Sequence, residues 1–236
     1  MRAFKTVATL LLLLTTVTLA QPARGEIVDR IVAVMDAGMV GESSTAGQII
    51  TWSAAYEEAC YLALQSGAEP PHWSATQSAG SDEIRGVVSR LIDQMLLLQA
   101  LNRSPFAPSS ETDLQSGTQE IEKRFPDPQS FRAALTRYHL TEAALSSRLE
   151  RESLILAFVD STLRPDVNVS SDQIESYYQL TLVPELRLRG QAGEIPPVEE
   201  VRGRIQEILI QQEMDRRLEQ WLGQLRRSAR IELRLE

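Results

Sequence analysis

The stretch that decides the fold is the C-terminal one, residues 196–236, which reads PPVEEVRGRIQEILIQQEMDRRLEQWLGQLRRSARIELRLE. Its apolar residues recur in steps of three and four, so they fall on one stripe of a long helix, with Pro197 suited to the first turn. After Ala229, apolar and charged residues alternate, which is typical of a strand over residues 230–235. A lone strand is not stable, so this one needs partners. The helical stripe comprises Val198, Val201, Ile205, Ile208, Leu209, Met214, Leu218, Trp221, Leu222 and Leu225.

The partners of this strand are expected at the other end of the chain. Residues 26–36, EIVDRIVAVMD, are rich in β-branched side chains and predict a first strand. Residues 47–52, GQIITW, predict a second strand, and the small residues 37–46 predict a loop between the two. We therefore expect a small antiparallel sheet that joins this N-terminal hairpin to the C-terminal strand.

Helices are expected between the hairpin and the C-terminal stretch. Helical spacing of apolar residues and capping residues such as Ser53, Ser81 and Thr141 mark their starts. Pro126 and Pro128 predict a break. The predicted helices cover residues 54–65, 84–102, 109–125 with Ser109 or Ser110 as cap, 131–138, 142–164, and 171–178 with Ser170 or Ser171 as cap. The predicted fold class is mainly α, with the small sheet tying the two chain ends together.

Residues 1–20 have the pattern of a secretory signal peptide, with Arg2 and Lys5 before an apolar run that ends at Ala20. A membrane anchor is the alternative, but the run is short for a span of about 20 residues. The formal net charge of −8 is unsuited to coating nucleic acid or anionic lipid. We expect an exported, soluble protein with no nucleic-acid partner and no stable membrane insertion.

The sequence carries no recognisable catalytic, cofactor or metal motif. It contains no G-x-S-x-G, no phosphate-binding glycine loop and no H-E-x-x-H. The two histidines, His72 in a proline-rich loop and His139 at a helix junction, each lack a second metal ligand nearby. The one cysteine, Cys60, cannot form an internal disulfide, and a buried position in a helix is favoured over a reactive thiol. We assign no catalytic, cofactor-binding or metal residue.

Five strings, taken in order, are similar to the SurA-type periplasmic chaperones, which are related to the parvulin-type foldases. The first three resemble the strands and helices of the N-terminal domain of that family, the fourth its next helix pair, and the fifth the segment that leads into a parvulin isomerase domain. The strings are IVDRIVAVMD, GQIITWSAAYEEA, RGVVSRLIDQMLLLQAL, FRAALTRYHLTEAALSSRLERESLILAFVDSTLRP and VSSDQIESYYQ. The C-terminal helix and strand resemble the segment that completes the chaperone module.

The chain departs from this family in two places. Residues 37–46 look like an insertion where the family has a tight turn. More importantly, fewer than twenty residues separate Tyr178 from Pro196, whereas a parvulin domain needs roughly a hundred. The resemblance thus implies one chaperone-like domain, residues 21–236, without its isomerase. Within it, residues 26–180 form the N-terminal helical part, 181–195 a connection, and 196–236 the closing helix and strand.

Three hypotheses about function follow. The favoured one, implied by the resemblance, is an ATP-independent periplasmic holdase of a Gram-negative bacterium that binds unfolded outer-membrane or secreted polypeptides. The alternatives are a residual peptidyl-prolyl isomerase and an assembly subunit for one dedicated partner. The sequence leaves open whether the protein forms a homo-oligomer. The candidate client-binding residues are Met35, Trp52, Tyr56 and Met95, because aromatic and methionine side chains suit adaptable apolar surfaces. For each of them the plainer alternative is an ordinary core position.

Overall fold

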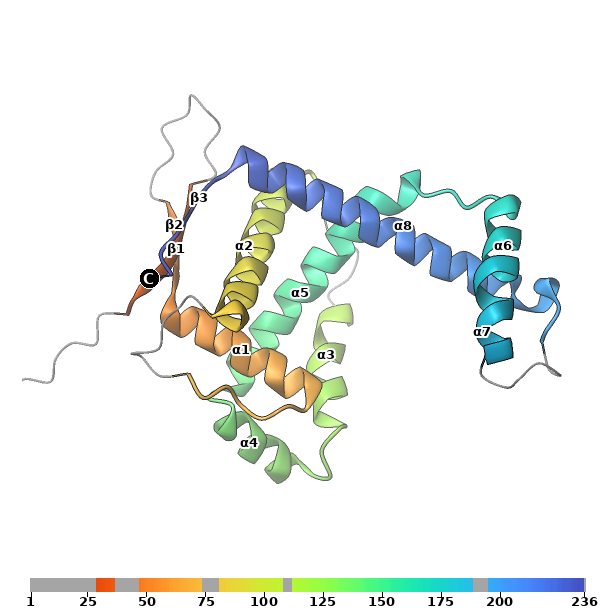
Figure 1. Ribbon diagram of the computed structural model, residues 1–236. Coiled ribbons are helices and arrows are strands. Elements are labelled where there is room, and N and C mark those ends of the chain that lie inside the picture. The colour runs from red at the N-terminus through yellow and green to blue at the C-terminus, as the bar shows by residue number, and fades with distance from the viewer. Residues whose placement is uncertain (1–28, 37–46, 74–80, 108–111, 189–194, 236) are drawn as a thin grey trace, which may run out of the picture.

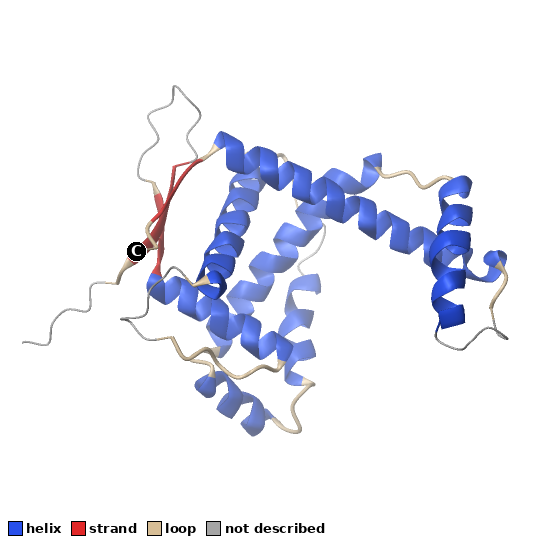
Figure 2. Cartoon of the chain, viewed as in Figure 1, coloured by secondary structure: helices blue, strands red, loops and turns tan. Residues whose placement is uncertain are grey.

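The computed structural model describes residues 29–36, 47–73, 81–107, 112–188 and 195–235. The predicted signal peptide, the predicted loop at 37–46 and the expected caps Ser109 and Ser110 lie outside these residues. The described chain is mainly helical and contains a small three-stranded antiparallel sheet (Figures 1 and 2). The predicted fold class is therefore confirmed.

The sheet joins the two ends of the chain, as the alternating pattern at 230–235 predicted. Its strands are β1 (Ile31–Asp36), β2 (Gln48–Thr51) and β3 (Arg230–Leu233), in the order β2-β1-β3. Both neighbours run antiparallel to β1, with Val34 opposite Ile49 of β2 and opposite Glu232 of β3. The C-terminal strand therefore adds the third strand that makes a short hairpin persist.

Five helices follow the hairpin: α1 (Trp52–Ser66), α2 (Asp82–Asn102), α3 (Thr112–Glu122), α4 (Pro128–Arg137) and α5 (Glu142–Leu163). The predicted caps Ser81 and Thr141 are confirmed, because their side chains accept hydrogen bonds from the N–H groups of Ile84 (3.4 Å) and Ala144 (3.1 Å). These bonds satisfy amide groups that no helical carbonyl can reach. They fix where α2 and α5 begin.

The remaining elements form an extension held by one long helix. After a 3-10 turn (Arg164–Asp166) come α6 (Ser171–Tyr177), a π-helical turn (Tyr178–Leu182), α7 (Val183–Leu188) and α8 (Val198–Ser228). The predicted cap Ser170 forms a reciprocal capping box with Gln173. In Figure 1, α8 runs from the α6–α7 pair across α5 and α2 to the sheet. The apolar stripe of this single helix therefore connects the α6–α7 pair, α5, α2 and the sheet.

The core divides into clusters on either side of α1. One cluster fills the space between the sheet, α1 and α2 and includes Val32, Met35 and Ile84. A second lies between α1, α3, α4 and α5 and includes Tyr61 and Leu145. Helix α1 thus contributes one face to each cluster, which explains why its apolar residues are not confined to a single narrow stripe.

The starts of α1, α4 and α8 differ from the prediction for physical reasons. The cap of α1 is Thr51 rather than Ser53: Thr51 Oγ1 accepts from the N–H of Ala54 (3.3 Å), so Trp52 starts the helix instead of ending the strand. Ser53 instead donates its backbone N–H to Asp29 (3.1 Å). Helix α4 begins at Pro128, capped by Asp127, because proline lacks only an N–H that the first turn leaves unused. Pro197 is likewise the cap of α8 rather than part of its first turn.

The connection predicted over 181–195 is also wrong in its first part. Residues up to Leu188 are helical, because the chain continues through the π-helical turn into α7. Pro184 has no N–H to donate backward, and the wider turn just before it accommodates the missing bond. Residues 189–194 lie outside the described part of the chain.

Candidate functional site

An apolar groove runs along α8 where this helix crosses α5 and α2. It consists of two adjoining hollows of about 440 Å³ each, which share Asp215 and Leu218. Each hollow has the size of a ligand-binding cleft, which is typically about 300–1,000 Å³. We call this feature the α8 groove. Its apolar lining consists of Leu156, Ala157 and Val159 from α5, and Met214, Leu218 and Leu222 from α8.

The spacing of residues on the two helices explains the groove. Met214, Leu218 and Leu222 follow one another in steps of four, so they line one face of α8. Met214 and Val159 are buried and form the floor. Leu156, one turn earlier on α5, is 68% exposed and forms the lip. The groove therefore has a dry base and an open apolar edge that no described residue covers.

The walls of the groove are held by contacts between α8 and its neighbours. The ring of Trp221 lies 5.6 Å from that of Phe158 in α5. Arg226 donates hydrogen bonds to Asp93 Oδ1 (2.6 Å), Ser89 Oγ (2.6 Å) and the Ser89 carbonyl (3.2 Å), all in α2. The bond to Asp93 raises the pKa of Arg226, so this side chain stays charged. The groove is thus preformed, which reduces the entropy lost when something binds.

The rim of the groove is mainly acidic. Asp93, Asp160, Asp215 and Glu219 line it, against the single arginine Arg226. Asp160 also accepts a hydrogen bond from Arg164 (2.7 Å), and Asp215 accepts one from Gln211 (2.9 Å). An apolar segment that carries Lys or Arg beside its apolar side chains would match both the floor and the rim.

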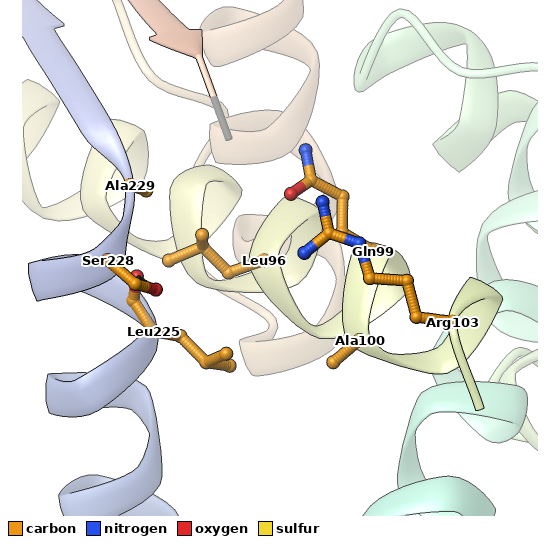
Figure 3. Close-up of a pocket in the computed structure, with 7 residues that line it drawn as sticks. All are labelled: Leu96, Gln99, Ala100, Arg103, Leu225, Ser228 and Ala229. Atoms are coloured by element: carbon orange, nitrogen blue, oxygen red, sulfur yellow. Dashed lines mark hydrogen bonds between the residues drawn. The ribbon is translucent and has the colours of Figure 1, made fainter. Parts of the chain in front are cut away.

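A smaller hollow of about 150 Å³ lies farther along, between the C-terminal ends of α2 and α8. Figure 3 shows Leu96 and Ala100 of α2 facing Leu225 of α8 and Ala229 just after it, with Gln99 and Arg103 at one side. Gln99 donates to the side chain of Gln48 in β2 (3.0 Å). This hollow is close to the sheet and too small for a peptide side chain and its backbone, so we assign it to packing.

Two of the four sequence-predicted client-binding residues, Trp52 and Tyr56, take part in an aromatic cluster. The ring of Trp73 lies 5.6 Å from that of Trp52 and 6.0 Å from that of Tyr56, which in turn lies 5.9 Å from the ring of His139. Arg30 stacks over Trp52 at 4.3 Å. All but His139 are half-buried, and His139 is exposed. The spacing of Trp52 and Tyr56 on α1 indicates their shared face, but the sequence did not indicate that Trp73 would join them.

The other two predicted residues lie deeper. The side chain of Met35 is 1% exposed beneath the sheet, so Met35 occupies an ordinary core position, which was the alternative to client binding. Met95 is half-buried and packs against the same cluster from α2. None of the four residues lines the α8 groove. The groove residues were missed because their grouping depends on how α5 and α8 cross, which the apolar spacing of either helix alone does not specify.

A buried ionic network lies between α1, α2 and α5. Glu58 is fully buried and accepts hydrogen bonds from Arg90 (2.8 Å) and Gln94 (3.3 Å) of α2 and from Arg148 of α5. Arg90 also reaches Glu152 (3.1 Å), which accepts a bond of 2.5 Å from the Tyr61 hydroxyl. Burial lowers the pKa of Arg148 and raises that of Tyr61. Every member is paired, so we interpret this network as a structural tie between three helices.

Two further reactive side chains of the described residues, Cys60 and His72, do not line the α8 groove. Cys60 is buried in α1, as the sequence favoured, and burial raises the pKa of its thiol. His72 is exposed. The described residues contain no group of three or more His, Cys, Asp or Glu side chains placed to hold a metal ion. Among the described helices, none combines the length and apolarity that crossing a membrane requires.

Comparison with known proteins adds no family assignment. Neither a protein-family model nor a curated protein matches the sequence.

Proposed function

We propose that this protein is an ATP-independent chaperone, a holdase, which keeps unfolded polypeptides from aggregating by holding their apolar segments in the α8 groove. The observation that carries the proposal is the open, preformed apolar groove itself, with Leu156 standing 68% exposed at its lip. An exposed apolar surface of this kind is unfavourable in water unless something covers it for part of the time. The resemblance of the sequence strings to the SurA-type chaperones supports the same proposal.

The size of the groove favours weak and reversible binding. Burying one large apolar side chain of a client contributes about 1.5–3 kcal/mol, and two hollows of about 440 Å³ hold only a few such side chains. Ordering the client chain offsets part of this gain. Met214 in the floor can adjust its shape to different side chains. Release then follows from modest affinity and needs no nucleotide hydrolysis.

We infer that the clients are outer-membrane or secreted polypeptides met in the periplasm. The acidic rim supports a preference for apolar segments flanked by Lys or Arg. The proposal includes no isomerase step.

Suppression of aggregation tests the proposal. A denatured outer-membrane porin and an unrelated denatured protein are each diluted into buffer without ATP, with and without the purified protein. We expect less light scattering for both at near-stoichiometric ratios. Protection of neither, with the protein folded, would refute the proposal, and protection of one dedicated partner only would favour the assembly-subunit hypothesis.

A matched pair of variants assigns the effect to the groove. Leu156→Asn places an amide at the lip, whereas Leu188→Asn makes the same change at a leucine that is 89% exposed at the end of α7, outside the groove. Both sites are exposed, so neither substitution disturbs the core. We expect Leu156→Asn to weaken protection and Leu188→Asn to leave it unchanged.

A further inference from the structure

One edge of strand β3 pairs with β1. In the described part of the chain no strand pairs with its other edge, which we call the free edge. The register shows which backbone groups face each side. The N–H of Arg234 donates to the carbonyl of Val32 (2.8 Å), and the same register places Glu232 opposite Val34. Because hydrogen-bonded positions alternate along an antiparallel pair, the backbone groups of Ile231 and Leu233 point toward the free edge.

The side chains of β3 separate by charge onto the two faces of the sheet. Ile231 lies opposite Met35 and, like Leu235, packs against the core under the sheet. Leu233 belongs to this face too but is 54% exposed at the edge of the core. Arg230, Glu232 and Arg234 occupy the outer face and are exposed, and Arg234 donates to Glu232 (2.9 Å). The free edge thus has an apolar face with an uncovered leucine and a face of alternating charge.

We propose that a second copy of this chain pairs with the free edge of β3, antiparallel, about a two-fold axis at Leu233. Leu233 of each copy would then exchange both backbone hydrogen bonds with the second copy's Leu233. Ile231 would lie opposite the second copy's Leu235 on the apolar face. Glu232 would lie opposite the second copy's Arg234, twice, on the outer face. The two sheets become one sheet of six strands, and each exposed Leu233 is covered by the other.

The register and the charge pattern of β3 together select this arrangement. An axis at Glu232 would also pair the outward-facing groups of Ile231 and Leu233, but it would place Glu232 opposite the second copy's Glu232 and Arg230 opposite its Arg234, and like charges directly opposite each other are destabilising. An axis at Ile231 would place Leu233 opposite Ala229, which is the C-terminal cap of α8. Of these three axes, the one at Leu233 pairs opposite charges and does not need the N–H of Ala229, which already donates to the carbonyl of Leu225 (3.1 Å). A client strand would not in general carry charges that match those of β3, whereas a second copy does. A second copy is therefore the occupant that the free edge favours.

The pairing is expected to be weak by itself. An edge of five or six residues buries much less than the roughly 1,000 Å² that specific stable interfaces exceed. Self-association should therefore depend on concentration, and a covalent trap is the sharpest way to detect it.

Cysteine cross-linking tests the two-fold axis directly. In a Cys60→Ala background, Leu233→Cys places two thiols opposite each other, with Cα atoms about 5.5 Å apart, inside the range of a disulfide. Arg230→Cys is the matched control, because the same pairing separates its two copies by about 20 Å. We expect mild oxidation to give a covalent dimer for Leu233→Cys and mainly monomer for Arg230→Cys. No cross-link, or equal cross-linking of both variants, would overturn the proposal.

Charge reversal gives a second test that needs no cysteine. Glu232→Arg places like charges opposite each other at two symmetric positions, and sedimentation equilibrium should show self-association weakened about tenfold. The double variant Glu232→Arg with Arg234→Glu restores opposite charges across the axis and should recover the original association. Failure of the double variant to recover, or an unchanged Glu232→Arg, would overturn the proposal.

Discussion

Replacing Glu58 by glutamine should destabilise the fold strongly although it changes only one atom of a side chain. Glu58 is fully buried and accepts hydrogen bonds from Arg90, Gln94 and Arg148, so its charge serves two helices at once. Glutamine keeps the size and one acceptor oxygen but removes the negative charge. The stability lost then depends on whether water can solvate Arg90 and Arg148 once the carboxylate is gone.

The structure separates the two arginines by exposure. The side chain of Arg148 is 17% exposed and loses the carboxylate that neutralises it. Breaking a buried pair in this way costs about 3–5 kcal/mol. Glu152 remains near both arginines and glutamine still accepts one bond, so we expect about 3 kcal/mol, at the lower end. The side chain of Arg90 is 44% exposed, so water solvates it once the carboxylate of Glu58 is gone. Losing the Arg90–Glu58 pair therefore adds less than about 1 kcal/mol to the loss of stability.

Urea unfolding followed by circular dichroism measures this loss, and the adjacent exposed residue provides the control. Glu57→Gln makes the same chemical change one position earlier at an exposed site, where we expect a change within about 0.5 kcal/mol. In thermal unfolding, Glu58→Gln should lower Tm by about 6–12 °C for a chain of this size.

Removing both charges should recover most of the stability. The double variant Glu58→Gln with Arg148→Met leaves no unpaired buried charge between α1 and α5, and should be more stable than Glu58→Gln alone. A loss below about 1 kcal/mol for Glu58→Gln, or a double variant less stable than both single variants, would refute the claim that this network ties the helices together.

Three further predictions use shifted pKa values. Burial raises the pKa of Cys60, so a thiol reagent at pH 8 should react slowly with the native protein and rapidly after denaturation; rapid native reaction would contradict its burial. Burial and the hydrogen bond to Glu152 raise the pKa of Tyr61, so the stability this phenol contributes is complete below the unfolded value of about 10 and is lost as pH rises above it. Tyr61→Phe should therefore show a smaller loss of stability between pH 9 and pH 11 in urea unfolding, and an equal loss would contradict this. Hydrogen bonds from Arg216 and Arg217 lower the pKa of Glu213 to about 2, so its contribution to stability is present above pH 4.5 and is lost as pH falls toward 2. Carboxyl chemical shifts followed by NMR should show Glu213 titrating later than the other glutamates in an acid titration, and titration near 4.5 would exclude this pairing.

The sheet and most helices could be predicted from sequence because their signals are local and repeated. The alternation at 230–235 has period two, and the β-branched residues of 26–36 and 47–52 indicate its partner strands at the N-terminal end. Ser81 and Thr141 stand directly before apolar helical patterns, so their caps were identified correctly. The cap of α1 was predicted at Ser53 but lies at Thr51, because the strand passes directly into the helix and no turn residue marks the boundary between them.

The groove and the ionic network could not be predicted because both depend on contacts distant in sequence. Leu156 lies within an apolar run of α5 and looks like any other core residue until the crossing of α8 leaves it exposed. Glu58 follows Glu57 near a helix start, where acidic residues are expected on the surface. Only the packing of α2 and α5 against α1 shows that one glutamate is fully buried and the other exposed.

Photocross-linking from the lip of the α8 groove tests the central claim most directly. A photoreactive amino acid at position 156, and in a second variant at position 188, is illuminated while the protein holds a denatured outer-membrane porin in solution. Our account predicts strong cross-links to the porin from position 156 and few from position 188, since both sites are exposed but only the first lines the groove. Equal cross-linking from both positions, or cross-linking from position 188 alone, would contradict the proposal that clients are held in the groove.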